Sequence, residues 1–186
     1  MFPTLESKRV ILRLPKPYDL VSFFYYASKP NIGPSAGWFP HQNLDDTKKV
    51  LDLFIKEGNI WAITIKPEDV MVGSIGLHSR MDDIVNGMGC EIGFALDDSY
   101  WNKGYMTEAV KLVMDYVFKE LSFDYLLVSH ADFNLSSKKV IEKCGFKYQY
   151  TSKKTYIENP EIMDVLYYKL TKKEYLKNEN RTEHEI

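Results

Sequence analysis

A turn containing Gly104 separates an apolar segment from an amphipathic one, and this arrangement could bind an anion. Residues 89–96 have the pattern of a β-strand, and residues 104–119 repeat apolar side chains at the spacing of one helix face. The first four amides of a helix have no intrahelical acceptor and carry the positive end of the helix dipole, so they can hold a phosphate. Gly104 would let the backbone approach that ligand closely, and Thr107 could add a hydroxyl group.

Physical reasoning alone leaves two interpretations of this segment open. It lacks the Gly-x-x-x-x-Gly-Lys-Ser/Thr sequence of a P-loop and the Gly-x-Gly-x-x-Gly fingerprint of dinucleotide-binding folds. Any strand followed by a glycine turn and a helix would look similar. The segment could therefore be a phosphate site or an ordinary structural turn.

Several segments, taken in order, resemble the GNAT acetyltransferases. Trp101-Asn-Lys-Gly-Tyr-Met-Thr-Glu-Ala109 is similar to their pyrophosphate loop, in the form used by the branch that contains ribosomal-protein N-terminal acetyltransferases. Residues 72–77 and 91–96 resemble the third and fourth strands of that branch. Residues 134–146 resemble its Asn-x-x-Ser … Glu-Lys-x-Gly-Phe segment, and Asp164–Leu170 its closing strand. The resemblance covers roughly residues 5–176.

The loop departs from the superfamily pattern of Gln/Arg-x-x-Gly-x-Gly/Ala. Trp101 holds the first position and Met106 the last, and Asn102 stands where the branch often has glycine. These changes alter side chains and leave the main-chain amides in place, so a pyrophosphate cradle is still expected.

The resemblance implies that acetyl-CoA is the cofactor and CoA the product. It places the pantetheine arm beside the end of the fourth strand and the phosphates on the loop. The implied cofactor-binding residues are Phe94, Ala95, Leu96, Asn102, Lys103, Gly104, Tyr105, Met106, Thr107, Asn134 and Ser137. Asn134 could equally be a helix N-cap, and Ser137 could lie on a buried helix stripe.

The implied reaction is attack of a neutral amine on a thioester carbonyl. An α-amine loses its proton more readily than a lysine, because its pKa is about 7.7–8.0 against about 10.4. Glu91 is the first candidate for the general base, acting directly or through water, although it could instead be a solvent-facing or ion-paired strand residue. Asp97 and Asp164 are weaker candidates. A main-chain amide near residues 94–96 could stabilise the oxyanion.

The resemblance also assigns catalytic roles to two residues of the second motif. Ser137 occupies the place where many relatives carry a tyrosine, so it could donate a proton or hydrogen bond to the leaving thiolate. Asn134 could hydrogen-bond the pantetheine or the acceptor. His78 could line the acceptor pocket, or it could be a structural strand residue.

The elements that must position these residues follow the order β-αα-βββ-α-β-α-ββ. This order predicts an α/β (α+β) class and a GNAT fold, with a mixed sheet of about seven strands flanked by about four helices. Residues 30–40 are predicted to be a loop, Asn43 an N-cap and Gly145 a helix-ending residue. A single domain is expected over residues 1–176. Residues 177–186 are a polar tail that is expected to end without structure.

Bulk properties narrow the class of protein. The chain has 186 residues, 45% of them apolar, and a formal net charge of −2 without a basic cluster, which argues against a nucleic-acid partner. No apolar run approaches the roughly 18–20 residues of a membrane span, so a cytoplasmic location is expected. Cys90 and Cys144 lack metal-ligand spacing, so no metal is expected and buried reduced thiols are favoured.

The leading hypothesis is transfer of an acetyl group to a primary amine, with the N-terminal α-amine of a protein such as a ribosomal protein as the closest analogy. One alternative is a small amine acceptor: a polyamine, an amino acid or an antibiotic. Another is a non-catalytic acyl-CoA-binding module, and a third is a structural interaction domain without CoA affinity. A homodimer is left open by the aromatic strand near the C-terminus.

Overall fold

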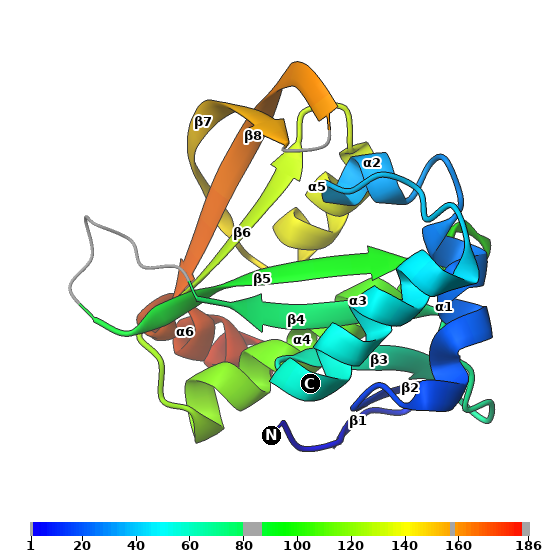
Figure 1. The fold of residues 1–186 in the computed structure, drawn as a ribbon. Coiled ribbons are helices and arrows are strands. Elements are labelled where there is room, and N and C mark those ends of the chain that lie inside the picture. The colour runs from blue at the N-terminus through cyan, green and yellow to red at the C-terminus, as the bar shows by residue number, and fades with distance from the viewer. Residues whose placement is uncertain (1, 80–86, 157–158, 184–186) are drawn as a thin grey trace.

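A mixed sheet of eight strands runs through the centre of the computed structural model, which describes residues 2–79, 87–156 and 159–183 (Figure 1). The strand order is β1-β2-β3-β4-β5-β6-β8-β7. The strands are β1 (Leu5–Glu6), β2 (Val10–Arg13), β3 (Ile60–Ile65), β4 (Gly73–His78), β5 (Gly89–Leu96), β6 (Tyr125–Ala131), β7 (Lys147–Tyr156) and β8 (Asn159–Thr171). β5 and β6 are parallel, and the other neighbours are antiparallel. The fold class and predicted element order are confirmed, with β1 as an additional strand.

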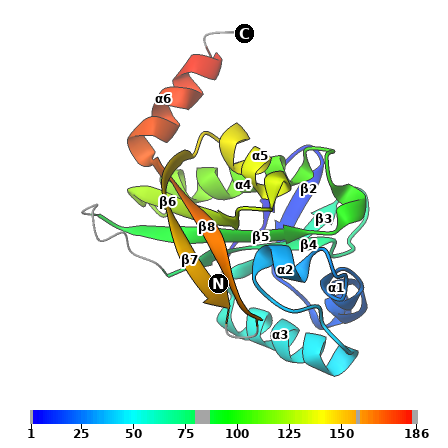
Figure 2. The ribbon, with the colours of Figure 1, turned by 90° about the horizontal axis from the view of Figure 1, so that it is seen from above.

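Helices cover both faces of this sheet (Figure 2). One face carries α1 (Leu20–Ala27), α2 (Gly33–Ala36) and α3 (Leu44–Glu57); the other carries α4 (Tyr105–Asp115) and α5 (Leu135–Lys143), and α6 (Lys172–Glu183) follows β8. Short 3-10 turns cover Pro17–Asp19 and Asp98–Tyr100, and a π-type turn, Tyr116–Glu120, extends α4. No helix in the described part of the chain is long and apolar enough to cross a membrane.

Two clusters of buried side chains hold the helices to the sheet. The larger one joins α4 to the sheet and includes Ala109, Val113 and Ile92, each at most 1% exposed. The smaller one lies under α1 and α3 and includes Phe23 and Leu51. Both helices that border the phosphate-binding turn are therefore fixed by apolar packing, because burying such side chains contributes about 1.5–3 kcal/mol each.

The polar residues after Thr171 form helix α6, where the sequence had suggested an unstructured end. Thr171 and Glu174 make a capping box: the Glu174 carboxylate accepts from the Thr171 amide at 3.0 Å, and the Thr171 hydroxyl accepts from the Glu174 amide at 3.3 Å. Tyr175 is buried and stacks on Phe118, with ring centroids 4.9 Å apart. Burial would raise the pKa of Glu174, but bonds from Lys147 and Thr171 lower it to about 2.

Asn43 begins α3 as predicted. Its side-chain oxygen accepts a hydrogen bond from the Asp46 amide at 2.9 Å, which satisfies one of the four amides that a helix start leaves without a partner. Replacing Asn43 by Ala should lower the free energy of unfolding by about 1 kcal/mol, whereas Asn43→Ser should nearly retain it. Urea unfolding would measure both. Equal stability of the two variants would contradict a contribution from the cap.

Gly145 ends α5 as predicted, in the left-handed region at φ 84°. Its amide donates to Glu142 O at 3.0 Å, and the Phe146 amide donates to Ile141 O at 3.3 Å. These two bonds make a Schellman ending, which fixes the direction in which the chain leaves α5 for β7.

The sheet opens between its two central strands. β5 and β6 pair only from Gly89↔Tyr125 to Ile92↔Val128, after which β5 pairs with β4 alone and β6 with β8 alone. Figure 1 shows the two strands diverging from this point. The divergence leaves one side of the end of β5 without a neighbouring strand.

Candidate active site

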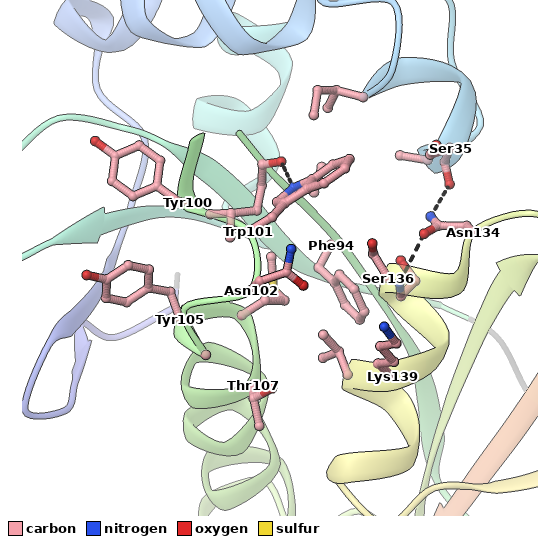
Figure 3. A pocket seen from close by; sticks show the side chains of 18 of the residues that line it. Ser35, Phe94, Tyr100, Trp101, Asn102, Tyr105, Thr107, Asn134, Ser136 and Lys139 are labelled. Carbon is pink, nitrogen blue, oxygen red and sulfur yellow. Dashed lines mark hydrogen bonds between the residues drawn. The ribbon is translucent and has the colours of Figure 1, made fainter. Parts of the chain in front are cut away.

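A cavity of about 270 Å³ lies where β5 and β6 diverge (Figure 3). The end of β5, the turn into α4, α5 and the segment around α2 contribute to its wall. The lining residues are Ile32, Ser35, Ala36, Phe94, Ala95, Leu96, Tyr100, Trp101, Asn102, Gly104, Tyr105, Met106, Thr107, Asn134, Ser136, Ser137, Lys139, Val140 and Lys143. The structure thus brings together ten of the eleven residues that the sequence nominated for the cofactor.

The main chain of Phe94 faces the opening. Asp97 N donates to Val72 O at 2.8 Å, so alternate residues of β5, counted back from Asp97, direct their amides and carbonyls toward β4. Phe94 and Leu96 fall between them and direct these groups toward β6, beyond the last β5–β6 pair. This geometry could offer an amide donor and a carbonyl acceptor to an extended ligand lying along β5.

The turn between β5 and α4 holds two residues in the left-handed region. Gly104 has φ 83° and Asn102 has φ 59°. Asparagine tolerates this region better than most residues, which explains how it can stand at a position often held by glycine. The turn thereby exposes the N-terminus of α4 to the cavity, where orphan amides and the helix dipole favour an anion.

The two departures at the ends of the loop have structural roles. Trp101 donates its indole N–H to Leu96 O at 2.7 Å and so fastens the loop to the end of β5 (Figure 3). Met106 is 6% exposed and belongs to the larger core cluster. These contacts hold the start of α4 beside the strand.

Asp97 and Asp98 also fix the start of the loop. Asp97 is 3% exposed, lies 2.9 Å from the Lys29 ammonium and accepts from the Ser99 amide. Hydrogen bonds from Lys29 and Asn31 lower the pKa of Asp98 to about 2. Asp97 therefore acts as a structural anchor in an ion pair, which makes it a poor candidate for the general base.

Asn134 links α5 to α2. Its side-chain oxygen accepts from the Ser137 amide at 3.0 Å, which confirms it as an N-cap, and its amide nitrogen donates to Ser35 O at 3.0 Å (Figure 3). α2 lies within the segment expected to be a loop, and that expectation is wrong for Gly33–Ala36. The four-residue helix carries Ser35 and Ala36 into the cavity wall.

Lys103 is the nominated residue that does not line the cavity. Its ammonium donates to Ser99 O at 2.8 Å and lies 5.6 Å from the centre of the Tyr100 ring. Two other lysines do line it, Lys139 and Lys143, and the sequence analysis missed them. Their spacing of four residues on one helix face was the available signal, because such residues project from the same side of a helix.

Glu91 lies on the other face of the sheet from Phe94, since side chains alternate along a strand. Its carboxylate accepts from the Ser129 hydroxyl at 2.7 Å, and its register partner on β4 is His78. A Cβ atom at Gly93 would meet the His78 ring at 3.0 Å, so the missing side chain leaves room for the imidazole. This polar group lies on the α1–α3 side, outside the cavity lining.

The cysteines take no part in this site. Both are free and buried, and burial raises the pKa of each thiol to about 12. A thiol with that pKa is a poor nucleophile at neutral pH. Among the described residues no group of His, Cys, Asp or Glu has the arrangement of a metal site.

Comparison with known proteins identifies the family. The family model described as acetyltransferase (GNAT) domain matches residues 9–147. The chain belongs to the GNAT acetyltransferase family. This GNAT domain is 26% identical over 177 residues to the N-acetyltransferase p20 of Bacillus licheniformis, covering 92% of this chain and 98% of that protein.

Solved structures agree with the fold. A GNAT-family acetyltransferase from Bacillus anthracis superposes with a TM-score of 0.81 and 22% identity, covering 92% of this chain and 99% of the other. The ribosomal-protein-S5-alanine acetyltransferase from Vibrio fischeri superposes with a TM-score of 0.70 and 21% identity, covering 94% and 99%. At these identities the superpositions establish the architecture, and the homologous family model establishes an acetyltransferase.

Proposed function

We propose that this GNAT domain transfers the acetyl group of acetyl-CoA to a primary amine. The observation that carries the proposal is the opening beside Phe94, which meets the exposed N-terminus of α4 in one cavity. GNAT acetyltransferases generally use acetyl-CoA, and that molecule combines an extended amide-containing arm with a diphosphate. An unpaired strand edge suits the arm, and helix amides suit the diphosphate.

The residues of the cavity would hold the cofactor by complementary groups. The turn from Asn102 to Thr107 would offer its amides to the diphosphate, and Lys139 and Lys143 would add positive charge from α5. The Phe94 main chain would bind the pantetheine arm. Acetyl-CoA would supply a thioester whose carbonyl carbon the amine attacks.

Proton transfer would involve groups on both faces of the sheet. Glu91 would accept the proton of the incoming amine through a water molecule, because it lies on β5 three residues before Phe94 and on the α1–α3 side. Ser137 would donate a hydrogen bond to the departing sulfur from the cavity wall. Asn134 would act mainly by holding α5 and α2 in register, since both ends of its amide already have protein partners.

The acceptor that we favour is the N-terminal α-amine of a polypeptide. With a pKa of about 7.7–8.0 it is partly neutral at physiological pH, so it places a smaller demand on a single carboxylate than a lysine does. The Vibrio fischeri neighbour is named for a ribosomal-protein substrate, which gives an analogy for this class of acceptor. A small amine remains the alternative for the same chemistry.

A free-thiol release assay would test the proposal. Purified protein would be incubated with acetyl-CoA and, in separate reactions, with short peptides that have a free α-amine, the same peptides blocked at the N-terminus, and polyamines. We expect thiol release with the free peptides and a mass increase on their N-termini. Release with polyamines alone would favour the small-amine alternative, and CoA binding without release across the panel would indicate a non-catalytic module.

A further inference from the structure

A cluster at the N-terminal end of β2 grips the helix that follows the cofactor loop. The Glu108 carboxylate accepts from the Ser7 hydroxyl at 2.6 Å, from the Arg9 amide at 3.0 Å and from Arg9 Nε at 2.8 Å. The Arg9 guanidinium also lies 2.7 Å from Glu108 in an ion pair. Ser7 and Arg9 come from a segment about one hundred residues away in sequence, so these bonds tie the N-terminal strands to the start of α4.

Arg9 reaches beyond Glu108 to the loop itself. Its NH1 group donates to Lys103 O at 3.1 Å, and the guanidinium lies 4.7 Å from the centre of the Tyr105 ring. A Cβ atom at Gly104 would lie 3.3 Å from its NH2 group. One side chain therefore contacts the loop on both sides of Gly104, and both Gly104 and Tyr105 line the cavity.

The charge of Glu108 makes this contact consequential. Glu108 lies in the first turn of α4, whose amides point toward the cavity. Burial opposes ionisation there, but bonds from Ser7 and Arg9 outweigh it and lower the pKa of Glu108. The side chain is thus an anion near the place where a diphosphate would bind, and like charges repel. Arg9 offsets that charge and holds the carboxylate on the β2 side.

We propose that Arg9 is a positioning residue for the cofactor, which acts through Lys103, Gly104 and Glu108 by fixing the loop and neutralising the carboxylate beneath it. The inference rests on the proposed function, because it concerns the loop that would hold the acetyl-CoA phosphates. It assigns Arg9 no contact with the reacting atoms. Removing Arg9 should therefore weaken cofactor binding and leave the rate at saturating acetyl-CoA unchanged.

The test is a double-mutant cycle on Arg9 and Glu108, with calorimetry of acetyl-CoA binding as its first readout. Arg9→Gln should raise the dissociation constant about tenfold, because it removes a cation and exposes an anion near a helix N-terminus. Glu108→Gln should change it by less than about threefold, and the double variant should recover most of the loss. Arg9→Lys should fall between wild type and Arg9→Gln.

Steady-state kinetics and thermal unfolding complete the test. In Arg9→Gln the KM for acetyl-CoA should rise with the dissociation constant while kcat stays constant. Lys48→Gln, which breaks an exposed ion pair with Asp52 on α3, is the matched control and should leave binding unchanged. A general loss of folding would lower the unfolding temperature and kcat together, which would overturn the positioning role.

Other outcomes also decide against the inference. Equal affinity of wild type and Arg9→Gln for acetyl-CoA overturns it and leaves the proposed function standing. No recovery in the double variant would mean that Arg9 binds the phosphates directly, which also overturns it. Absence of CoA binding by the unmodified protein overturns the proposed function and the inference together.

Discussion

Substituting Val for Gly104 should abolish acetyl-CoA binding at concentrations where the unmodified protein is saturated. Gly104 has φ 83°, a region that a β-branched residue adopts only at considerable cost, and a Cβ atom there would press within 3.3 Å of Arg9. Relieving the strain would rotate the amides at the start of α4 away from the diphosphate. Loss of two charge-assisted hydrogen bonds corresponds to a dissociation constant raised at least about 100-fold, which calorimetry would measure.

Gly58→Val is the matched control for this substitution. Gly58 ends α3 at φ 63° and does not line the cavity, so its substitution imposes similar backbone strain without touching the loop. We expect lower stability but unchanged acetyl-CoA affinity in the control. If Gly104→Val bound as tightly as wild type, the cofactor could not lie against this turn.

The phosphate-binding turn was predictable because its determinants are local. A strand, a glycine and an amphipathic helix follow one another within about thirty residues, and the caps at Asn43 and Gly145 depend on neighbours three to five residues away. Nearly all the residues nominated around this turn line the cavity. Short-range backbone preferences survive tertiary folding when packing does not oppose them.

Features that depend on distant contacts were missed. α2 has only four residues, too few for a periodic pattern, and its place at the cavity follows from the bond between Ser35 and Asn134, which are 99 residues apart in sequence. The Arg9–Glu108 contact spans the same separation. α6 differs, because the capping-box sequence Thr171-Lys-Lys-Glu174 was visible. Its low hydrophobicity hid the single anchor, Tyr175, which docks on Phe118.

Replacing Glu91 by Gln should lower kcat for amine acetylation by about 100-fold or more, within the range attributed to general acid–base catalysis. Glutamine has nearly the same shape, and its carbonyl oxygen can still accept from the Ser129 hydroxyl, so the fold should be retained. The variant lacks a group that can take the proton of the incoming amine. Because Glu91 does not line the cavity, the dissociation constant of acetyl-CoA should stay the same.

The pH dependence of the remaining rate separates a base from a structural residue. If Glu91 only removes a proton, its loss should matter less as the pH rises, because more of an α-amine with a pKa of about 7.7–8.0 is already neutral. Asp52→Asn, on the exposed surface of α3, should leave the pH profile of kcat unchanged. A constant deficit of Glu91→Gln across the pH range would argue for a positioning role. A deficit in Asp164→Asn with normal kcat in Glu91→Gln would move the base to β8, where Asp164 lies opposite Lys153.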